Sequence, residues 1–240
     1  KALILAGGLG TRLRPLLNDR PKPMAPIAGK PFLEYLLLQL SHYHVQDIIL
    51  SIGYQAKLIS DYFEDGKRWN LQIQYSYEEQ PLGTAGAVKL AEDYLQGDTF
   101  LVLNGDSFFN LDLTSFIQQH HSKNAQATIA LSAVESSQRY GRIELDQDGQ
   151  ILRFLEKSSE EGSQHTTSLI NAGVYLFNRP VLDIIPSGIP VSLEREIFPV
   201  LIGRQFYGVP YSAFFIDIGV PEDYLKLQQE PGRLLDFHGS

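Results

Sequence analysis

Residues 3–23 read LILAGGLGTRLRPLLNDRPKP, a stretch in which an apolar run passes directly into a glycine-rich loop. The run over residues 2–6 is typical of a strand buried on both faces of a sheet. Glycine allows close approach and unusual backbone angles, so the loop can wrap N–H groups around phosphate oxygens, although the same glycines can equally form a tight strand exit. Arg12, Arg14 and Lys22 favour the first alternative, because they place positive charge beside the loop of an otherwise acidic protein. We therefore expect a polyphosphate ligand here.

The loop sequence GGLGTR differs from two common phosphate-binding motifs. It is neither G-x-x-x-x-G-K-[ST] nor G-x-G-x-x-G, because Leu13 occupies the position of the third dinucleotide glycine. The chain also offers no convincing ribose-binding acid after the second expected strand. A kinase-type P-loop and a nicotinamide dehydrogenase are therefore disfavoured.

Strands and helices alternate in the first half of the chain. The hydrophobic spacing predicts helices over residues 32–43, 57–63, 85–95 and 113–121, and strands over residues 47–53, 71–77, 99–103 and 127–134. This order implies right-handed crossovers and parallel strand pairs. We expect a three-layer, Rossmann-like α/β fold with a mainly parallel central sheet.

The second half of the chain is richer in β-structure. Residues 142–157 (RIELDQDGQILRFLEK) form two strand-like segments around Asp148 and Gly149, a strong hairpin dipeptide. The remaining predicted elements are a strand over residues 169–178, a helix over 193–202, an aromatic extended region over 206–218 and a last helix over 221–229. The chain has no linker, repeat or low-complexity block, so residues 1–240 are expected to form a single domain.

Composition and charge exclude several classes of protein. The formal net charge of -8 argues against a nucleic-acid partner, because phosphate-backbone binding needs a basic surface. The absence of cysteine excludes disulfides, thiolate catalysis and cysteine-ligated zinc. There is no charged leader with a cleavage region and no apolar stretch approaching ~18–20 residues, so neither secretion nor a membrane partner is expected. We expect a cytoplasmic enzyme, and whether it forms a homo-oligomer stays open.

Seven short motifs occur in order along nearly the whole chain. They are LAGGLGTRLRPLLNDRPKPMAP (residues 5–26), EEQPLGTAGA (78–87), LNGDSFF (103–109), YGRIELD (140–146), FLEK (154–157), NAGVYLF (171–177) and FIDIGVPEDY (215–224). Together they resemble the signature of the sugar-1-phosphate nucleotidyltransferases, also called nucleotide-sugar pyrophosphorylases. KPMAPIAGKPFLEYLL and IDIGVPEDY are most similar to the bacterial D-glycero-D-manno-heptose 1-phosphate guanylyltransferases, with the mannose-1-phosphate guanylyltransferases close behind.

The resemblance implies that a sugar-1-phosphate oxygen attacks the α-phosphorus of a nucleoside triphosphate, giving a nucleotide-sugar for surface glycan synthesis and pyrophosphate. The expected substrates are GTP and D-glycero-D-manno-heptose 1-phosphate. The alternatives are GTP with mannose 1-phosphate, or glucose 1-phosphate with a thymidylyl, uridylyl or cytidylyl donor. The nucleophile arrives ionised, so positioning and charge stabilisation dominate and no general base is needed. The six histidines show no ligand or triad spacing and are interpreted as structural or solvated.

Two aspartates at strand ends are candidate metal ligands. Asp106 follows a buried strand, at the carboxyl edge where open α/β sheets bind ligands, and Asp217 in FIDIG also ends a strand beside glycine. Mg2+ prefers one or two carboxylates together with phosphate oxygens and waters, and the resemblance implies that this pair holds Mg2+. The simpler alternative is a turn cap after each strand.

The resemblance also assigns roles to the other motif residues. The catalytic residues are Arg12, which would bind the leaving phosphates, Lys22, which would contact the α-phosphate, and Asp106. The nucleotide-binding residues are Ala6, Gly7, Gly8, Gly10, Thr11, Arg12, Glu78, Gly83 and Thr84. The sugar-phosphate-binding residues are Gly141, Glu156, Lys157, Asn171, Gly173 and Glu194. The β-rich second half is thus expected to carry a smaller sugar-binding part.

Three of these assignments keep an alternative, and for Lys157 it is a surface lysine at the end of the hairpin, which the residues alone would favour. Glu78 is expected to read guanine, because one carboxylate accepts hydrogen bonds from both the ring N–H and the exocyclic amine. Glu79 is the fallback, since strand alternation turns only one of the two towards the ligand. Glu194, in SLEREIFP, lies either near the outer sugar hydroxyls or simply at a helix start, where acids are favoured.

A non-catalytic nucleotide-sugar-binding regulatory subunit is the alternative from another class of protein. Such a subunit is expected to have lost one or more of four residues, namely Arg12, Lys22, Asp106 and Asp217. All four are present, which favours an enzyme.

Overall fold

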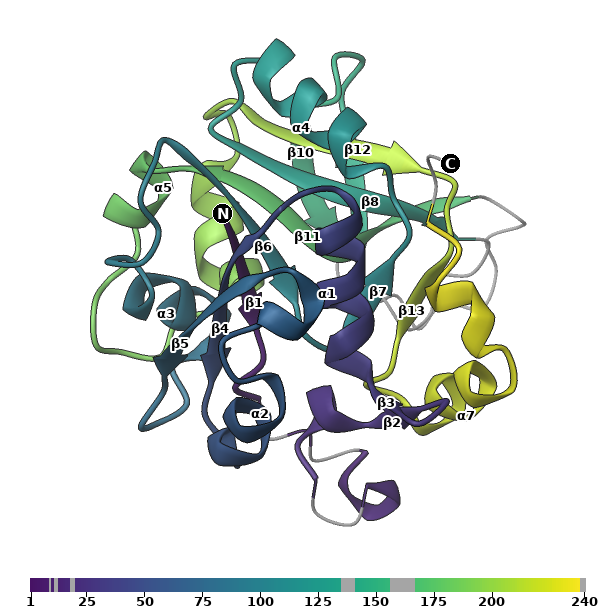
Figure 1. Ribbon diagram of the computed structural model, residues 1–240. Helices are drawn as coiled ribbons and strands as arrows, with labels where there is room; N and C mark the ends of the chain where they lie inside the picture. Colours follow the sequence, from purple (N-terminus) through teal and green to yellow (C-terminus); the bar gives the residue numbers. More distant parts are fainter. Residues whose placement is uncertain (9, 11–12, 18–19, 135–140, 156–166, 238–240) are drawn as a thin grey trace.

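The computed structural model describes residues 1–240 except 9, 11–12, 18–19, 135–140, 156–166 and 238–240. Within the described residues a nine-stranded sheet lies between two layers of helices (Figure 1). Its strands are β1 (Ala2–Leu5), β4 (Asp47–Ile52), β5 (Gln72–Tyr77), β6 (Thr99–Asn104), β8 (Ala127–Val134), β9 (Arg142–Leu145), β10 (Ile151–Leu155), β11 (Ser168–Asn178) and β12 (Phe206–Tyr211). The helices are α1 (Phe32–His42), α2 (Ala56–Phe63), α3 (Gly83–Leu90), α4 (Leu113–Ser122), α5 (Pro180–Asp183), α6 (Phe198–Leu201) and α7 (Pro221–Gln229).

The first half of the sheet is parallel and the second half is mixed. β1 pairs in parallel with β4 on one side and with β6 on the other, and β5 extends the sheet beside β4. β11 runs antiparallel to β6 and β8, and β12 lies parallel to β8. The β9–β10 hairpin joins the first part of β11 through the pair Ile170 and Arg142. The predicted α/β fold with a parallel sheet centre and a β-rich second half is confirmed.

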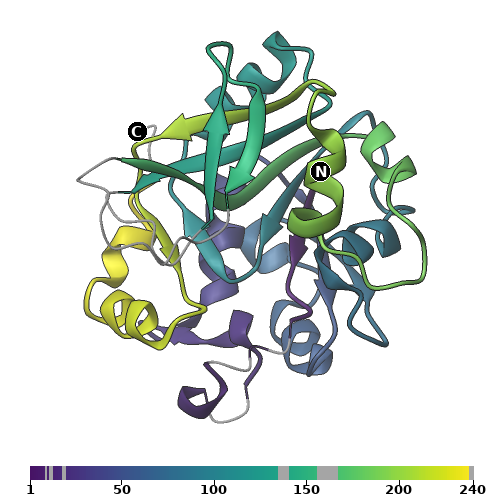
Figure 2. The ribbon, with the colours of Figure 1, turned by 180° about the vertical axis from the view of Figure 1, so that it is seen from behind.

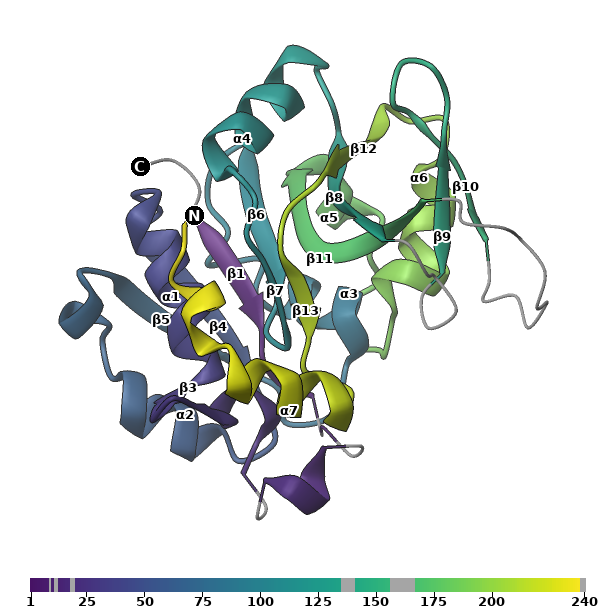
Figure 3. The ribbon, with the colours of Figure 1, turned by 90° about the vertical axis from the view of Figure 1, so that its right-hand side faces the viewer.

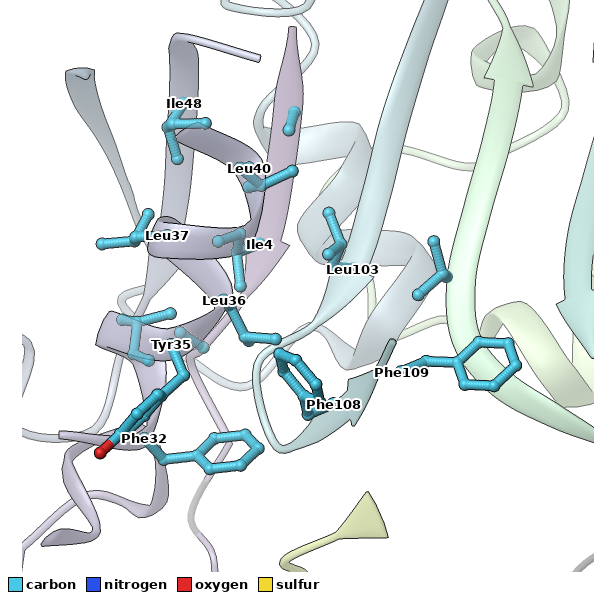
Figure 4. Packing of buried hydrophobic residues seen from close by; sticks show 14 of the residues in the cluster. Ile4, Phe32, Tyr35, Leu36, Leu37, Leu40, Ile48, Leu103, Phe108 and Phe109 are labelled. Carbon is cyan, nitrogen blue, oxygen red and sulfur yellow. The ribbon is translucent and has the colours of Figure 1, made fainter. Parts of the chain in front are cut away.

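Alternate residues of β1 point into two separate hydrophobic layers. Ala2 and Ile4 pack with α1, α2, α4 and α7 on one face, and Leu3 packs with α3, α5 and α6 on the other. Figure 4 shows Ile4 beside Leu36 and Leu40 of α1. Burying a leucine or isoleucine side chain contributes about 1.5–3 kcal/mol, so Leu3 and Ile4 stabilise the strand from opposite faces of the sheet. Figure 3 shows α1 and α7 on one side of the sheet, and Figure 2 shows the opposite side, where α6 lies.

Two predicted helices differ in the structure. The helix predicted over residues 85–95 ends earlier, since α3 stops at Leu90 and is followed by turns. The helix predicted over residues 193–202 is a π-helical turn, Leu193–Ile197, that continues as the four-residue α6. Pro199 explains this change, because it has no N–H to donate to the preceding turn and so interrupts a regular α-helical hydrogen-bond pattern.

Two small strand pairs lie outside the main sheet. β7 (Ser107–Phe109) pairs antiparallel with β13 (Phe215–Asp217), and β2 (Pro26–Ile27) pairs with β3 (Lys30–Pro31). Strands of two or three residues show no readable alternation, so the sequence did not predict β7, β2 or β3. The β7–β13 pair matters for the site, because it joins a segment just after β6 to one more than a hundred residues later.

Candidate active site

A cavity of about 370 Å³ opens where the carboxyl ends of the parallel strands meet. Its walls come from the segments that follow β1, β5 and β6, from the segment around Lys22 and from Gly219. The lining residues are Leu5, Ala6, Gly7, Gly8, Gly10, Leu13, Lys22, Pro23, Glu78, Pro81, Gly83, Thr84, Ala87, Asn104, Gly105, Asp106 and Gly219. The carboxyl edge of a parallel sheet is the usual ligand site of open α/β folds.

The glycine loop and Glu78 lie against each other in one wall of this cavity. A Cβ atom on Gly7 would collide with Oε1 of Glu78, so only glycine leaves room for that carboxylate. Oε1 accepts a hydrogen bond from Ser51 Oγ at 3.0 Å, and Oε2 accepts one from the Leu82 amide at 3.2 Å. The Glu78 amide donates to the Ile52 carbonyl at 2.8 Å, which continues the β4–β5 pairing to this point. The carboxylate is therefore oriented by partners from two different segments.

Glu79 points away from this wall. Its side chain is exposed and does not line the cavity, whereas Glu78 is half-buried and does. Both residues follow the end of β5 at Tyr77, and the Glu78 amide still pairs with β4 whereas Glu79 lies in a bend.

Lys22 lies between the two predicted metal ligands. Its side chain is only 10% exposed, and Nζ lies 2.6 Å from Asp106 Oδ2 and 3.6 Å from Asp217 Oδ1. The β7–β13 pair sets this geometry, because it places Asp217 opposite Ser107 and lets the Ile218 amide donate to the Asp106 carbonyl at 3.0 Å. Two carboxylates distant in sequence thus share one cation.

Glu194 lies beside the cavity at the start of the π-helical turn. Its Oε2 accepts hydrogen bonds from Thr84 Oγ1 and Ser192 Oγ, both at 3.0 Å. Ser192 in turn caps the turn by accepting from the Arg195 amide at 3.2 Å. Of the two alternatives for Glu194, these contacts favour the helix-start role, with a link to the cavity only through Thr84.

The predicted sugar-side residues are only partly brought to the cavity. Gly173 approaches Asn104, which lines the cavity, and its amide donates to Asn171 Oδ1 at 2.9 Å. Gly141 lies before β9, where a Cβ atom would stand 3.1 Å from the Leu155 carbonyl oxygen, and it is not a lining residue. Thr11, Arg12, Glu156 and Lys157 lie outside the described residues, so their predicted roles stay predictions.

Several residues of the site were not among those predicted from the sequence. They are Ser51, Pro81, Asn104, Gly105, Tyr175 and Gly219. Ser51 did carry a signal, because it is a fully buried hydroxyl in the apolar strand DIILSI. Of the histidines within the described residues none lines the cavity.

The family model for nucleotidyl transferases matches residues 1–231, so the chain belongs to the nucleotidyl transferase family, as its motifs implied. It is 39% identical over 228 residues to the mannose-1-phosphate guanylyltransferase of Mycobacterium tuberculosis, with 94% of this chain and 62% of that protein covered. It is 38% identical over 232 residues to the D-glycero-alpha-D-manno-heptose 1-phosphate guanylyltransferase of Aneurinibacillus thermoaerophilus, with 96% and 97% covered.

A solved structure is similar over almost the same span. HddC from Yersinia pseudotuberculosis complexed with GMP-PN matches with a TM-score of 0.83 at 36% identity, covering 95% of this chain and 98% of that one. The chain therefore spans nearly the whole of HddC and of the Aneurinibacillus relative, but less than two thirds of the mycobacterial one. No helix among the described residues is long and apolar enough to cross a bilayer.

Proposed function

We propose that this chain transfers a guanylyl group from GTP to a sugar 1-phosphate, giving a GDP-sugar and pyrophosphate. The observation that carries the proposal is one cavity lined by the glycine loop, Glu78 and the Lys22–Asp106 pair. The two relatives named as guanylyltransferases, and the GMP-PN complex of a similar structure, support GTP as the donor.

Glu78 is proposed to select guanine. Each of its carboxylate oxygens has one protein donor, from Ser51 or from the Leu82 amide, and a carboxylate oxygen offers about two acceptor sites. Each oxygen therefore keeps capacity for one of guanine's two adjacent donors, the ring N–H and the amine. Uracil and thymine present a single ring N–H flanked by carbonyl oxygens, and one of these would face a carboxylate oxygen. That repulsion would add discrimination to the lost hydrogen bond.

The glycine loop and Lys22 are proposed to hold the triphosphate. The amides of Gly7, Gly8 and Gly10, which line the cavity, would donate to phosphate oxygens, and Arg12 would bind the leaving phosphates. The ammonium group of Lys22 would move from Asp106 to the α-phosphate oxygens and bind them there, where negative charge grows as the sugar phosphate attacks. Because the nucleophile is already an anion, the protein's task is to align it and to neutralise charge.

Asp106 and Asp217 fit a magnesium site. Both carboxylates reach one common cation, since the ammonium of Lys22 lies within 3.6 Å of each. No cluster of three or more candidate ligands occurs among the described residues, and two carboxylates suffice for Mg2+, which takes its other ligands from phosphates and water. When bound, Mg2+ would supply neutralisation of phosphate charge and lower the barrier to transfer.

The sugar is proposed to be D-glycero-D-manno-heptose 1-phosphate, with mannose 1-phosphate as the second candidate. The Aneurinibacillus relative, which this chain covers over 97% of its length, supports the heptose, and the mycobacterial relative supports mannose. Asn171 and Gly173 are proposed to contact the sugar hydroxyls, and Lys157 its phosphate. They belong to the half of the chain that carries β8 to β11.

The test is pyrophosphate release measured with four nucleoside triphosphates against mannose, glucose and heptose 1-phosphates in the presence of Mg2+. We expect the highest kcat/KM for GTP with the heptose phosphate. A higher value with mannose 1-phosphate would move the assignment to the second candidate. The absence of pyrophosphate in every combination, from a protein that still binds GTP, would favour a regulatory subunit instead.

A further inference from the structure

Tyr175 carries a polar group to the edge of the site from inside the hydrophobic core. The residue is fully buried, and its ring packs against Phe177 at 5.7 Å and Phe198 at 5.4 Å between ring centroids. A buried tyrosine hydroxyl in such surroundings needs hydrogen-bond partners, because leaving it without them is costly. Its partners come from the two sides of the site.

Tyr175 lies just after an irregularity in β11. The pairing of β11 with β8 shifts register between Asn171 and Tyr175, and Gly173 within this stretch has a φ of +74°. A Cβ atom on Gly173 would stand 2.6 Å from Ser107 Oγ and 2.9 Å from Asn104 Nδ2. The bulge therefore presses the backbone of β11 against the segment that carries Asp106, which an ordinary side chain would prevent.

The hydroxyl of Tyr175 fixes the orientation of Asn171. Asn171 Nδ2 donates to Tyr175 Oη at 3.0 Å, and Asn171 Oδ1 accepts from the Gly173 amide at 2.9 Å. A backbone amide can only donate, so the amide group of Asn171 has one possible orientation and one N–H left for a ligand. Asn104 also lines the cavity, and its Nδ2 lies 3.5 Å from the same hydroxyl.

Burial and nearby negative charge both keep the Tyr175 hydroxyl protonated. Burial raises the pKa of Tyr175 well above its ordinary value, and the negative charges of Glu194 and Asp106 raise it further. The hydroxyl therefore stays neutral at any working pH. A neutral phenol with a fixed position can hydrogen-bond to the side-chain amides of Asn171 and Asn104 without changing the charge of the site.

We infer that Tyr175 is a positioning residue for the sugar phosphate: through Asn171 it sets the one amide N–H that meets a sugar hydroxyl, and through Asn104 it ties that group to the nucleotide cavity. This inference rests on the proposed function. It assigns to Tyr175 of the NAGVYLF motif an indirect role in sugar binding, because the tyrosine does not touch the sugar.

The test compares Tyr175→Phe with Tyr35→Phe, using GTP and whichever of the heptose, mannose or glucose 1-phosphates the wild type uses most efficiently. Tyr35 is an equally buried tyrosine whose hydroxyl donates to the Ile27 carbonyl at 2.9 Å, so it is a matched control for loss of one buried hydroxyl. We expect Tyr175→Phe to raise KM for the sugar phosphate roughly fivefold or more while KM for GTP stays within about twofold. Tyr35→Phe should change neither KM.

A double-mutant cycle with Asn171→Ala tests the route of the effect. If Tyr175 acts through Asn171, the double variant should be no worse in KM for the sugar phosphate than Asn171→Ala alone. Fully additive effects, equal changes in both KM values, or a Tyr175→Phe protein that does not fold would each overturn the inference. A wild type inactive with all three sugar phosphates would overturn the proposed function and this inference with it, whereas an active wild type with an unchanged Tyr175→Phe variant would overturn the inference alone.

Discussion

The proposed nucleotide side and the proposed sugar side of the site are built in different ways. On the nucleotide side, parallel strands end at one edge, and the loops that follow them would meet the ligand with backbone groups and single, oriented side chains such as Glu78. On the sugar side, one antiparallel strand, β11, is bent by a bulge and held by side-chain hydrogen bonds that reach into the core. The first side depends on local sequence, and the second depends on contacts between distant segments.

Asp106 and Asp217 are the proposed metal ligands, so their loss should have the largest effect. We expect Asp106→Asn and Asp217→Asn each to lower kcat by about a thousandfold or more, because charge neutralisation on a transferred phosphoryl group is worth several kcal/mol. Pyrophosphate release over a range of Mg2+ concentrations measures this. Asp61→Asn is the matched control, since Asp61 pairs with Lys57 on an exposed helix face and should leave kcat unchanged. Near-native turnover of either variant would remove that residue from the metal site.

Lys22 tests the cation that both carboxylates share. We expect Lys22→Met to lower kcat by about a hundredfold, comparable to the loss of one preorganised donor in a transition-state site. The variant should also melt at a lower temperature, because Asp106 and Asp217 lose the ammonium that lies between them. Calorimetry and pyrophosphate release measure the two effects. Lys57→Met, on the exposed face of α2, should change neither, and a similar small effect of both substitutions would contradict the role proposed for Lys22.

Substitution of Glu78 tests how strongly the nucleotide side discriminates between guanine and other bases. Charge-assisted hydrogen bonds are worth roughly 1.5–3 kcal/mol, so Glu78→Gln should reduce the preference for GTP over UTP by about tenfold or more with little change in melting temperature. The ratio of kcat/KM for the two nucleotides is the measurement. Glu79→Gln is the control one residue along the chain, and its exposed side chain should leave the ratio unchanged. Equal use of GTP and dTTP by the wild type would overturn the assignment.

The sequence predicted the nucleotide side more completely than the sugar side. The glycine loop itself indicated a phosphate site at Gly7, and the resemblance assigned Glu78 to the base; in the structure both residues line one cavity near strand ends, and their roles stay predictions. The closeness of Asp106 and Asp217 was expected only from the resemblance. In the structure it depends on the β7–β13 pair, whose strands of three residues have no readable pattern.

The parts that could not be predicted share a physical cause. Tyr175 reads as an ordinary core aromatic in a strand, and only the register shift in β11 turns its hydroxyl towards Asn171. Such a shift arises from packing between strands that are distant in sequence, and local propensity does not predict this packing. Ser51 is the intermediate case. A hydroxyl in an apolar strand indicates that a hydrogen-bond partner exists, but it does not indicate which residue that partner is.

His120 offers a last and smaller way to separate the two sides, through pH. It lies on α4 with 1% of its surface exposed, and its ring contacts Thr128 of β8 at 2.8 Å and Asn178 of β11 at 3.1 Å. Asn178 donates its Nδ2 to the Ala125 carbonyl, so its Oδ1 faces the ring and Nε2 carries the proton of a neutral imidazole. Burial lowers the pKa of His120 below its ordinary value, which the hydrogen bond to Asn178 only partly offsets.

The sign of the pH effect follows from that direction. Below about pH 6.5 the unfolded chain takes up a proton at this histidine more readily than the folded protein does. The stability that neutral His120 contributes is therefore fully present above that pH. It is lost as the pH falls towards the lowered pKa of His120 in the folded protein. We expect the melting temperature of the wild type to fall between pH 7.5 and 5.5 by more than that of His120→Gln, which cannot titrate. Hydrogen exchange should place the loss first in amides of β8 and β11, because the ring bonds to those strands, while amides of β1 and β4 stay protected. An identical pH dependence in wild type and variant, or earlier exchange in β1, would show that acid weakens the parallel side of the sheet instead.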